Sequence, residues 1–354
     1  MPPVNLTQIF GHPSSNHKGD RYTQSRGGYS GMTQTEEIPV HGTIHFNPSF
    51  DEVAVAEAIE RSLRNKEKLR AVQLLVSGNN AQRQMIRTPY KTRFGKDLED
   101  DMKKTLSGDL EEFVVALLQT QPKYDAVELH RSMKGLGTNE KNLIELLATR
   151  TNEELEAAKN TFYMNYKKTL EDAIGGDTSG DFKKLLTVML QCKRDETSNV
   201  EFYRVSQDAE KLLKSLDKNS GIDKIEAWRL LAMANGPHLQ RVFADVQNAT
   251  GKPVDKIIEK EFSGDARALL NALVTIAQSK PKYFANQIHL ATKGMGTNDK
   301  DLIRILVSRS ETDLAAIAEE YRRANGKTLQ QLITDECKGE YRDALLAIVK
   351  GNRI

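Results

Sequence analysis

Two short loops in the sequence combine closely spaced glycines with an acidic residue further along the chain. Residues 135–138 read Gly-Leu-Gly-Thr, and residues 294–297 read Gly-Met-Gly-Thr. Glycine adopts positive φ angles readily, so two glycines two positions apart can turn several backbone carbonyls to one side. Such a group of carbonyls is half of a cation site, and calcium, which prefers six to eight oxygen ligands, would need a carboxylate to complete it.

An acidic residue stands at the same distance from both loops. Thirty-eight residues separate Thr138 from Asp177, and the same number separates Thr297 from Glu336. One glycine pair alone usually marks only a turn. Because both pairs have an acid at equal spacing, the sequence favours calcium binding over two unrelated turns.

The two loops belong to a longer internal repeat. When the two loops are superposed, Arg150 aligns with Arg309, and Lys-Thr-Leu follows at the same place in both copies. Two weaker copies lie before and after the copy that holds the first loop, where Gly108 and Gly264 take the place of Gly180. The body of the chain is therefore predicted to contain four copies of one unit.

Each copy is predicted to be helical. Apolar residues recur at three- and four-residue spacing, and glycine or proline occurs at regular breaks, which leaves room for about five short helices in a copy. The first 49 residues differ, because they are rich in glycine and histidine and poor in aliphatic residues, as in a flexible head. We predict an all-α protein with these boundaries: head 1–49, repeat 1 50–122, repeat 2 123–193, linker and repeat 3 194–281, repeat 4 282–354.

The composition narrows the functional classes. The chain of 354 residues carries 51 Lys and Arg against 49 Asp and Glu, so it gives no electrostatic case for a nucleic-acid partner. No run approaches the roughly 20 apolar residues of a membrane span. The opening residues lack the regions of a secretory signal, so we expect a cytoplasmic protein. Since no nucleophile-base or zinc-ligand pattern is visible, we also expect no enzyme.

The repeats and their loops identify the chain as resembling the annexin family. The resemblance rests on the motif Met-Lys-Gly-x-Gly-Thr at residues 133–138, which Asp177 follows after 38 intervening residues. It rests also on the four repeats of about seventy residues. The resemblance covers everything except the head. It implies four five-helix repeats in one compact, slightly curved body that binds anionic phospholipid membranes reversibly and peripherally when calcium rises; export by an unconventional route is compatible with it.

The resemblance also implies which residues bind calcium. Carried over position by position, the ligands are three backbone carbonyls and one carboxylate in each of two repeats: Met133, Gly135, Gly137 and Asp177 in repeat 2, and Thr292, Gly294, Gly296 and Glu336 in repeat 4. A lipid phosphate oxygen would fill a position that these ligands leave open. Lys134 and Lys293 would add attraction to anionic headgroups.

The other two repeats depart from this pattern. In repeat 1 the loop positions carry Leu-Arg-Asn-Lys at residues 63–66 and the acidic position carries Thr105, so we expect no comparable site. Repeat 3 keeps one glycine and the acid. It is predicted to bind calcium weakly through the carbonyls of Asp217, Asn219 and Gly221 and the carboxylate of Glu261.

Four charged residues match those that line the central channel in the family: Glu128, Glu145, Arg150 and Arg309. We interpret them as a buried ion-pair network that holds repeats 2 and 4 together. Two alternative functions stay open. The head, through Val4, Leu6, Ile9 and Phe10, could recruit a protein partner to a scaffold, or the chain could act as an ion channel.

Overall fold

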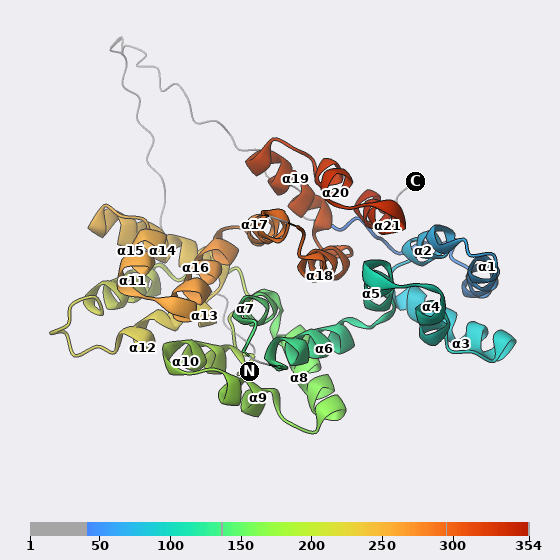
Figure 1. The fold of residues 1–354 in the computed structure, drawn as a ribbon. Coiled ribbons are helices and arrows are strands. Elements are labelled where there is room, and N and C mark those ends of the chain that lie inside the picture. The colour runs from blue at the N-terminus through green and yellow to red at the C-terminus, as the bar shows by residue number, and fades with distance from the viewer. Residues whose placement is uncertain (1–40, 136, 295, 353–354) are drawn as a thin grey trace, which may run out of the picture. The chain divides into compact units, whose positions relative to one another are not determined.

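The computed structural model describes residues 41–135, 137–294 and 296–352 (Figure 1). All regular structure in these ranges is helical, in 21 helices with no strand, so the all-α prediction is confirmed. Residues 1–40 of the predicted head lie outside the described residues. Across the described ranges, no helix has both the length and the apolar character that crossing a bilayer requires.

Repeats 1 and 2 each contain five helices. Repeat 1 consists of α1 (Glu52–Arg64), α2 (Lys68–Val76), α3 (Asn80–Phe94), α4 (Leu98–Thr105) and α5 (Gly108–Leu118). Repeat 2 consists of α6 (Gln121–Met133), α7 (Glu140–Thr149), α8 (Asn152–Tyr166), α9 (Leu170–Asp177) and α10 (Gly180–Met189).

Repeats 3 and 4 follow the same order, except that the second helix of repeat 3 is divided into two short segments. Repeat 3 consists of α11 (Phe202–Lys214), α12 (Lys224–Trp228), α13 (Leu230–Met233), α14 (Gly236–Thr250), α15 (Val254–Glu261) and α16 (Gly264–Gln278). Repeat 4 consists of α17 (Lys280–Thr292), α18 (Asp299–Arg309), α19 (Leu314–Asn325), α20 (Leu329–Glu336) and α21 (Gly339–Lys350).

The third helix of every repeat ends with the same local signal. The third helix ends each time at a residue in the left-handed conformation, with φ between 55° and 67°: Gly95, Lys167, Gly251 and Gly326. A left-handed residue closes the last turn and reverses the chain, and glycine adopts that conformation without strain. Capping boxes start α3, α8 and α20, and in α8 the box is formed by Thr151 before the helix and Glu154 in its first turn.

The helices bury their apolar faces both within and between repeats. The first and third helices pack against each other in all four repeats, as α1 with α3 and α6 with α8. Between repeats, α5 contacts α18 and α2 contacts α21, while α7 contacts α16. Repeat 1 therefore packs beside repeat 4, and repeat 2 beside repeat 3 (Figure 1).

Residues 41–49, which composition places in the predicted head, pack against the repeats. The backbone N–H groups of Thr43 and Ile44 donate to the carbonyl of Ser310 at 2.7 and 2.9 Å. The Asn47 side chain donates to the carbonyl of Ser77 at 2.9 Å, so the segment spans from repeat 4 to repeat 1. A Cβ on Gly42 would collide with the Ser310 carbonyl, so glycine permits this close approach.

Repeats 2 and 4 are joined by a buried ion-pair cluster. The Arg304 guanidinium on α18 donates to both carboxylate oxygens of Glu145 on α7, at 2.8 and 2.9 Å. It also donates to Asp301 at 2.7 Å and lies 3.9 Å from Glu128. The Glu128, Glu145 and Arg304 residues are 2–3% exposed, so Glu145 depends on Arg304 for charge compensation, while Glu128 also accepts a hydrogen bond from Arg131 at 2.9 Å.

Of the four residues predicted for this network, the acids Glu128 and Glu145 lie in the cluster, whereas the bases Arg150 and Arg309 pair within their own repeats. Arg150 donates to Asp125 within repeat 2, at 2.7 Å through two nitrogens. Arg309 donates to Asp313 within repeat 4, also at 2.7 Å. Both arginines lie at the C-terminal ends of their helices, beyond the turn that forms the contact between α7 and α18, and each is satisfied by a carboxylate of its own repeat.

Removing the shared cation should destabilise the fold strongly. Arg304→Met leaves Glu145 buried without its counter-charge, while Glu128 keeps its pair with Arg131, and we expect this to cost about 3–5 kcal/mol of unfolding free energy in urea denaturation. Arg322→Met, which breaks an exposed pair with Glu319, should cost at most about 1 kcal/mol. Equal costs for the two variants would contradict the clamping role of Arg304.

Candidate functional site

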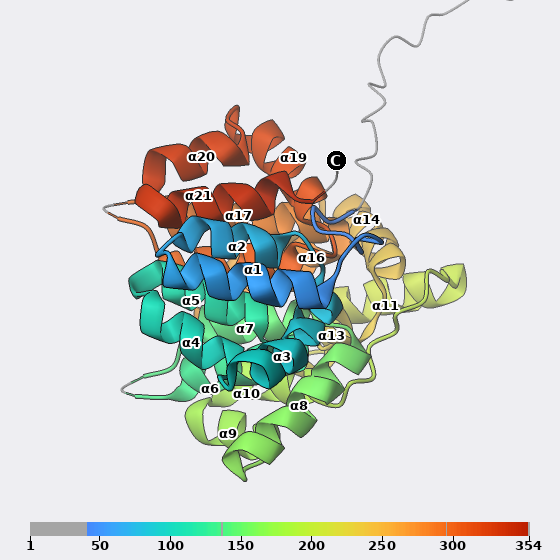
Figure 2. The ribbon, with the colours of Figure 1, turned by 90° about the vertical axis from the view of Figure 1, so that its right-hand side faces the viewer.

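The two predicted calcium loops have the same construction. One joins α6 to α7 and the other joins α17 to α18. At the base of the first loop the Asn139 N–H donates to the Ser132 carbonyl at 2.7 Å, and at the base of the second the Asn298 N–H donates to the Ala291 carbonyl at 2.7 Å. Both loops project from the same side of the body, at the left of Figure 2.

All four loop glycines have positive φ angles. The values are 112° at Gly135 and 89° at Gly137, against 123° at Gly294 and 97° at Gly296. A Cβ on any of the four would meet no atom within 4 Å. Glycine is therefore required by the backbone conformation and not by lack of space.

The carbonyls that the resemblance implies as ligands are available to a cation. No loop or capping hydrogen bond between described residues is donated to the carbonyls of Met133, Gly135 and Gly137, and the same holds for Thr292, Gly294 and Gly296.

The acidic residues stand at equivalent helix ends. Asp177 is the last residue of α9, Glu336 is the last residue of α20, and both are exposed. The Thr138 hydroxyl donates to the Asp177 carbonyl at 3.2 Å, which ties the first loop to the end of α9. The four predicted components of the repeat 2 site therefore belong to two segments that are in direct contact.

The donor set fits calcium better than a transition metal. Among the described residues there is no group of three or more His, Cys, Asp or Glu side chains that could hold a metal ion. Three carbonyls and one bidentate carboxylate would instead give about five oxygen ligands, short of the six to eight that calcium prefers. Lys134 and Lys293, both exposed, follow α6 and α17 directly and lie on the same two loops.

The loop between α1 and α2 of repeat 1 is shorter than the glycine loops, and its carbonyls are already hydrogen-bonded. The Glu67 N–H donates to the Ser62 carbonyl at 2.8 Å, which closes this loop with two fewer residues than the loops of repeats 2 and 4 have. Helix α1 continues to Arg64, and the carbonyls of Arg61 and Leu63 accept hydrogen bonds from the next residues of the turn. These carbonyls are therefore already engaged.

The predicted loop ligands of repeat 3 are partly engaged as well. Gly221 has a φ of 69°, but the Asp217 carbonyl accepts a hydrogen bond from the Ser220 N–H at 3.1 Å. The Asp217 carboxylate accepts another from the Asn219 N–H at 2.9 Å. Residues 217–220 thus form a local turn instead of an open set of carbonyls.

The acid of repeat 3 has an ammonium partner that sequence reasoning missed. Lys224 Nζ lies 2.7 Å from the Glu261 carboxylate, and this hydrogen bond lowers the pKa of Glu261. Lys224 is the first residue of α12, the position at which α7 has Glu140 and α18 has Asp299. The signal was visible in the sequence as a basic residue where repeats 2 and 4 have an acid.

Comparison with known proteins identifies what this arrangement resembles. The family model described as Annexin matches four segments, residues 55–117, 124–189, 207–273 and 283–348. Human annexin A11 is 39% identical over 313 residues, 88% of this chain but 62% of annexin A11. Bovine annexin A5 is 38% identical over 314 residues, which cover 88% of this chain and 98% of annexin A5.

Solved structures agree with the sequence comparison. The structure of annexin III superposes with a TM-score of 0.84 at 36% identity, covering 88% of this chain and 98% of that one. Chicken annexin V gives a TM-score of 0.80 at 40% identity, with 88% and 99% covered. Calcium-bound annexin (Sm)1 gives 0.79 at 28% identity, with 88% and 93% covered.

The Lys224–Glu261 pair should suppress cation binding in repeat 3. Lys224→Gln frees the carboxylate, so terbium luminescence excited through Trp228, the single tryptophan of the chain, should increase several-fold. Lys260→Gln, which removes a more distant and more exposed partner at 3.5 Å, should change it little. No gain in Lys224→Gln, or a gain that survives the further change Glu261→Gln, would count against this role of the pair.

Proposed function

We propose that this chain, which belongs to the annexin family, binds anionic phospholipid membranes through calcium held in the loops of repeats 2 and 4. Family membership supports calcium-dependent phospholipid binding in general. The finer assignment rests on one observation, the matched construction of the two loops with four glycines at positive φ.

In this proposal the backbone carbonyls and one acid of each repeat hold the ion. Met133, Gly135 and Gly137 act with Asp177, and the equivalent residues of repeat 4 act with Glu336. Each carboxylate contributes one negative charge, so a bound divalent cation keeps a net charge of about +1. A phosphate oxygen of a lipid suits a ligand position that about five protein oxygens leave open.

The pair of sites favours a membrane over a single soluble phosphate. Both loops project from one side of the body, so one membrane can engage both without a change in the fold (Figure 2). The second contact then forms at a high effective concentration, which strengthens binding beyond either site alone. Lys134 and Lys293, beside the two sites, add attraction to an anionic surface. Binding of this kind is peripheral and reversible, and it places the chain on the cytoplasmic face of a membrane.

Neither alternative function is favoured by a specific observation. The head residues that would recruit a protein partner lie outside the described residues. For the channel hypothesis, Glu145 and Arg304 are 2–3% exposed and bonded to each other, an arrangement suited to a structural clamp.

Loss of either acid should weaken membrane binding, and loss of both should nearly abolish it. Asp177→Ala and Glu336→Ala should each raise the calcium concentration needed for co-sedimentation with phosphatidylserine vesicles, because each removes one of two cooperating sites. Asp172→Ala, which removes an exposed acid earlier on α9, is the matched control and should behave like wild type. A double variant that sediments normally would refute the site assignment.

Calcium affinity should depend on lipid. Because the ligand sets are incomplete without phosphate, calorimetry on the protein alone should give dissociation constants of about 10⁻⁴–10⁻³ M, the range of weak extracellular calcium modules. Adding phosphatidylserine vesicles should tighten this binding. Submicromolar affinity in the absence of lipid would instead indicate sites completed by the protein itself.

A further inference from the structure

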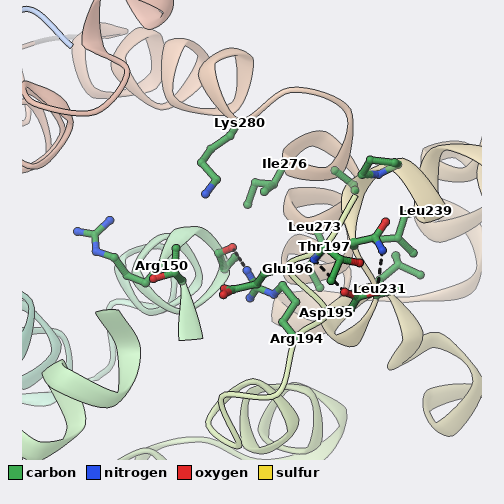
Figure 3. Close-up of a pocket in the computed structure, with 17 residues that line it drawn as sticks. Arg150, Arg194, Asp195, Glu196, Thr197, Leu231, Leu239, Leu273, Ile276 and Lys280 are labelled. Atoms are coloured by element: carbon green, nitrogen blue, oxygen red, sulfur yellow. Dashed lines mark hydrogen bonds between the residues drawn. The ribbon is translucent and has the colours of Figure 1, made fainter. Parts of the chain in front are cut away.

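A pocket of about 370 Å³ lies where the linker between repeats 2 and 3 crosses the end of α7 (Figure 3). Its walls come from the C-terminal end of α7, the linker, α13, the start of α14, α16 and the start of α17. One part of the lining is apolar and includes Leu231, Leu239, Leu273 and Ile276. Another part carries the cationic side chains of Arg194 and Lys280, with Lys280 extending into the pocket from α17 (Figure 3).

These two cations are satisfied by backbone carbonyls and not by acids. Lys280 Nζ donates to the Thr149 carbonyl at 2.9 Å, and Arg194 donates to the Ala148 and Leu147 carbonyls at 2.8 and 3.1 Å. Neither side chain has a salt bridge to a carboxylate of the described residues. The three carbonyls at the end of α7 carry only the partial negative charge of a helix terminus, which offsets less than one full charge.

Lys280 and Arg194 are therefore cations of the pocket lining that make no direct contact with a carboxylate of the described residues. Burial, together with the nearby guanidinium groups of Arg309 and Arg194, lowers the pKa of Lys280 to about 8. The other arginine of the lining, Arg150, is neutralised by its bidentate pair with Asp125. Lys280 and Arg194 are thus the cations that an added anion would stabilise.

The two acids of the lining have other partners. Asp195 accepts hydrogen bonds from the Asn235 side chain at 2.7 Å and from the Thr197 N–H at 2.9 Å. Glu196 accepts one from the Asn152 N–H at 2.7 Å, at the start of α8. Both acids are exposed. They stabilise helix starts and the linker, and they leave Lys280 without a carboxylate.

The charge of Lys280 is not required by the repeat framework. In the register that superposes the two glycine loops, its counterpart in repeat 2 is Gln121, whose side-chain amide donates to Glu154 at 3.1 Å. A neutral residue thus serves at the equivalent helix start. The lysine adds a cation to this pocket without being needed to begin the helix.

The pocket lies at the far end of α7 from the calcium loop. Helix α7 begins at Glu140, just after the loop, and ends at Thr149, whose carbonyl accepts the Lys280 bond. Ten helical residues span about 15 Å. A membrane engaged by the loops therefore does not face the pocket, and the ligand must come from the opposite side.

We propose that this pocket binds a small organic anion with an apolar body. The anionic group, a carboxylate or a phosphate monoester, is held by Arg194 and Lys280, and the apolar part packs against the leucine and isoleucine side chains. The volume is within the range of small-molecule pockets, which combine apolar walls with a few placed polar groups. Binding at this site is separate from calcium and from the membrane.

The test is calorimetry on the full chain without calcium, using octanoate, octyl phosphate, octanol and inorganic phosphate as probes. Octanoate or octyl phosphate should bind, and should do so at least about ten-fold more tightly than octanol and inorganic phosphate. The carboxylate and phosphate probes distinguish the two possible head groups. Binding of octanol as tight as that of the anions, or no binding of either anion, would overturn the proposal.

Matched variants locate the binding. Lys280→Gln, which introduces the residue found in repeat 2, should weaken binding of the anionic probe about ten-fold or more, while Lys280→Arg keeps the charge and should retain it. Lys282→Gln removes an exposed charge two residues further along α17 and should bind like wild type. Circular dichroism establishes that each variant is folded. Equal losses in Lys280→Gln and Lys282→Gln would mean a general charge effect and would refute the assigned site.

Discussion

The contact between Glu145 and Arg304 determines how the rest of the molecule is arranged. The two residues occupy equivalent positions in repeats 2 and 4, since the register that superposes the two glycine loops also aligns them. The equivalent helices α7 and α18 therefore meet at corresponding points. Two identical charged residues there would bury like charges, which is strongly unfavourable, so the repeats must differ at this position. With the two helices fixed in this way, the loops that precede them project from one side.

The four repeats share a helical framework but not a loop chemistry. The left-handed end of the third helix occurs in all four, and the pairing of the first and third helices does too. The loop before the second helix differs in each odd-numbered repeat, by a two-residue shortening at Glu67 and by the Lys224–Glu261 pair. Because the framework does not depend on this loop, the cation-binding features can be lost from a repeat without loss of its fold.

The sequence was sufficient for features that repeat and insufficient for features that depend on distant contacts. Apolar periodicity and the regular glycine and proline breaks predicted the helices, and the internal repeat related the two glycine loops to each other. The charged residues carried over from the family resemblance did not include Arg304, whose counterpart in repeat 2 has the opposite charge. The shortened loop of repeat 1 was also missed, because repeats 1 and 2 were aligned without a gap. The packing of residues 41–49 depends on Ser310 and Ser77, which composition alone could not connect to that segment.

Helix α7 lies between the proposed calcium loop of repeat 2 and the proposed anion pocket, and its length separates the two electrostatically. Its first turn, with Glu140, follows the loop of repeat 2, and its last carbonyls accept the bonds of Arg194 and Lys280. Interactions with a helix dipole fall off within the first or last turn, and α7 has nearly three turns. A charge added at one end therefore changes the field at the other end very little. Communication between the ends would require movement of whole repeats against one another, and the buried Glu145–Arg304 pair, which lies in the middle of α7, opposes that movement.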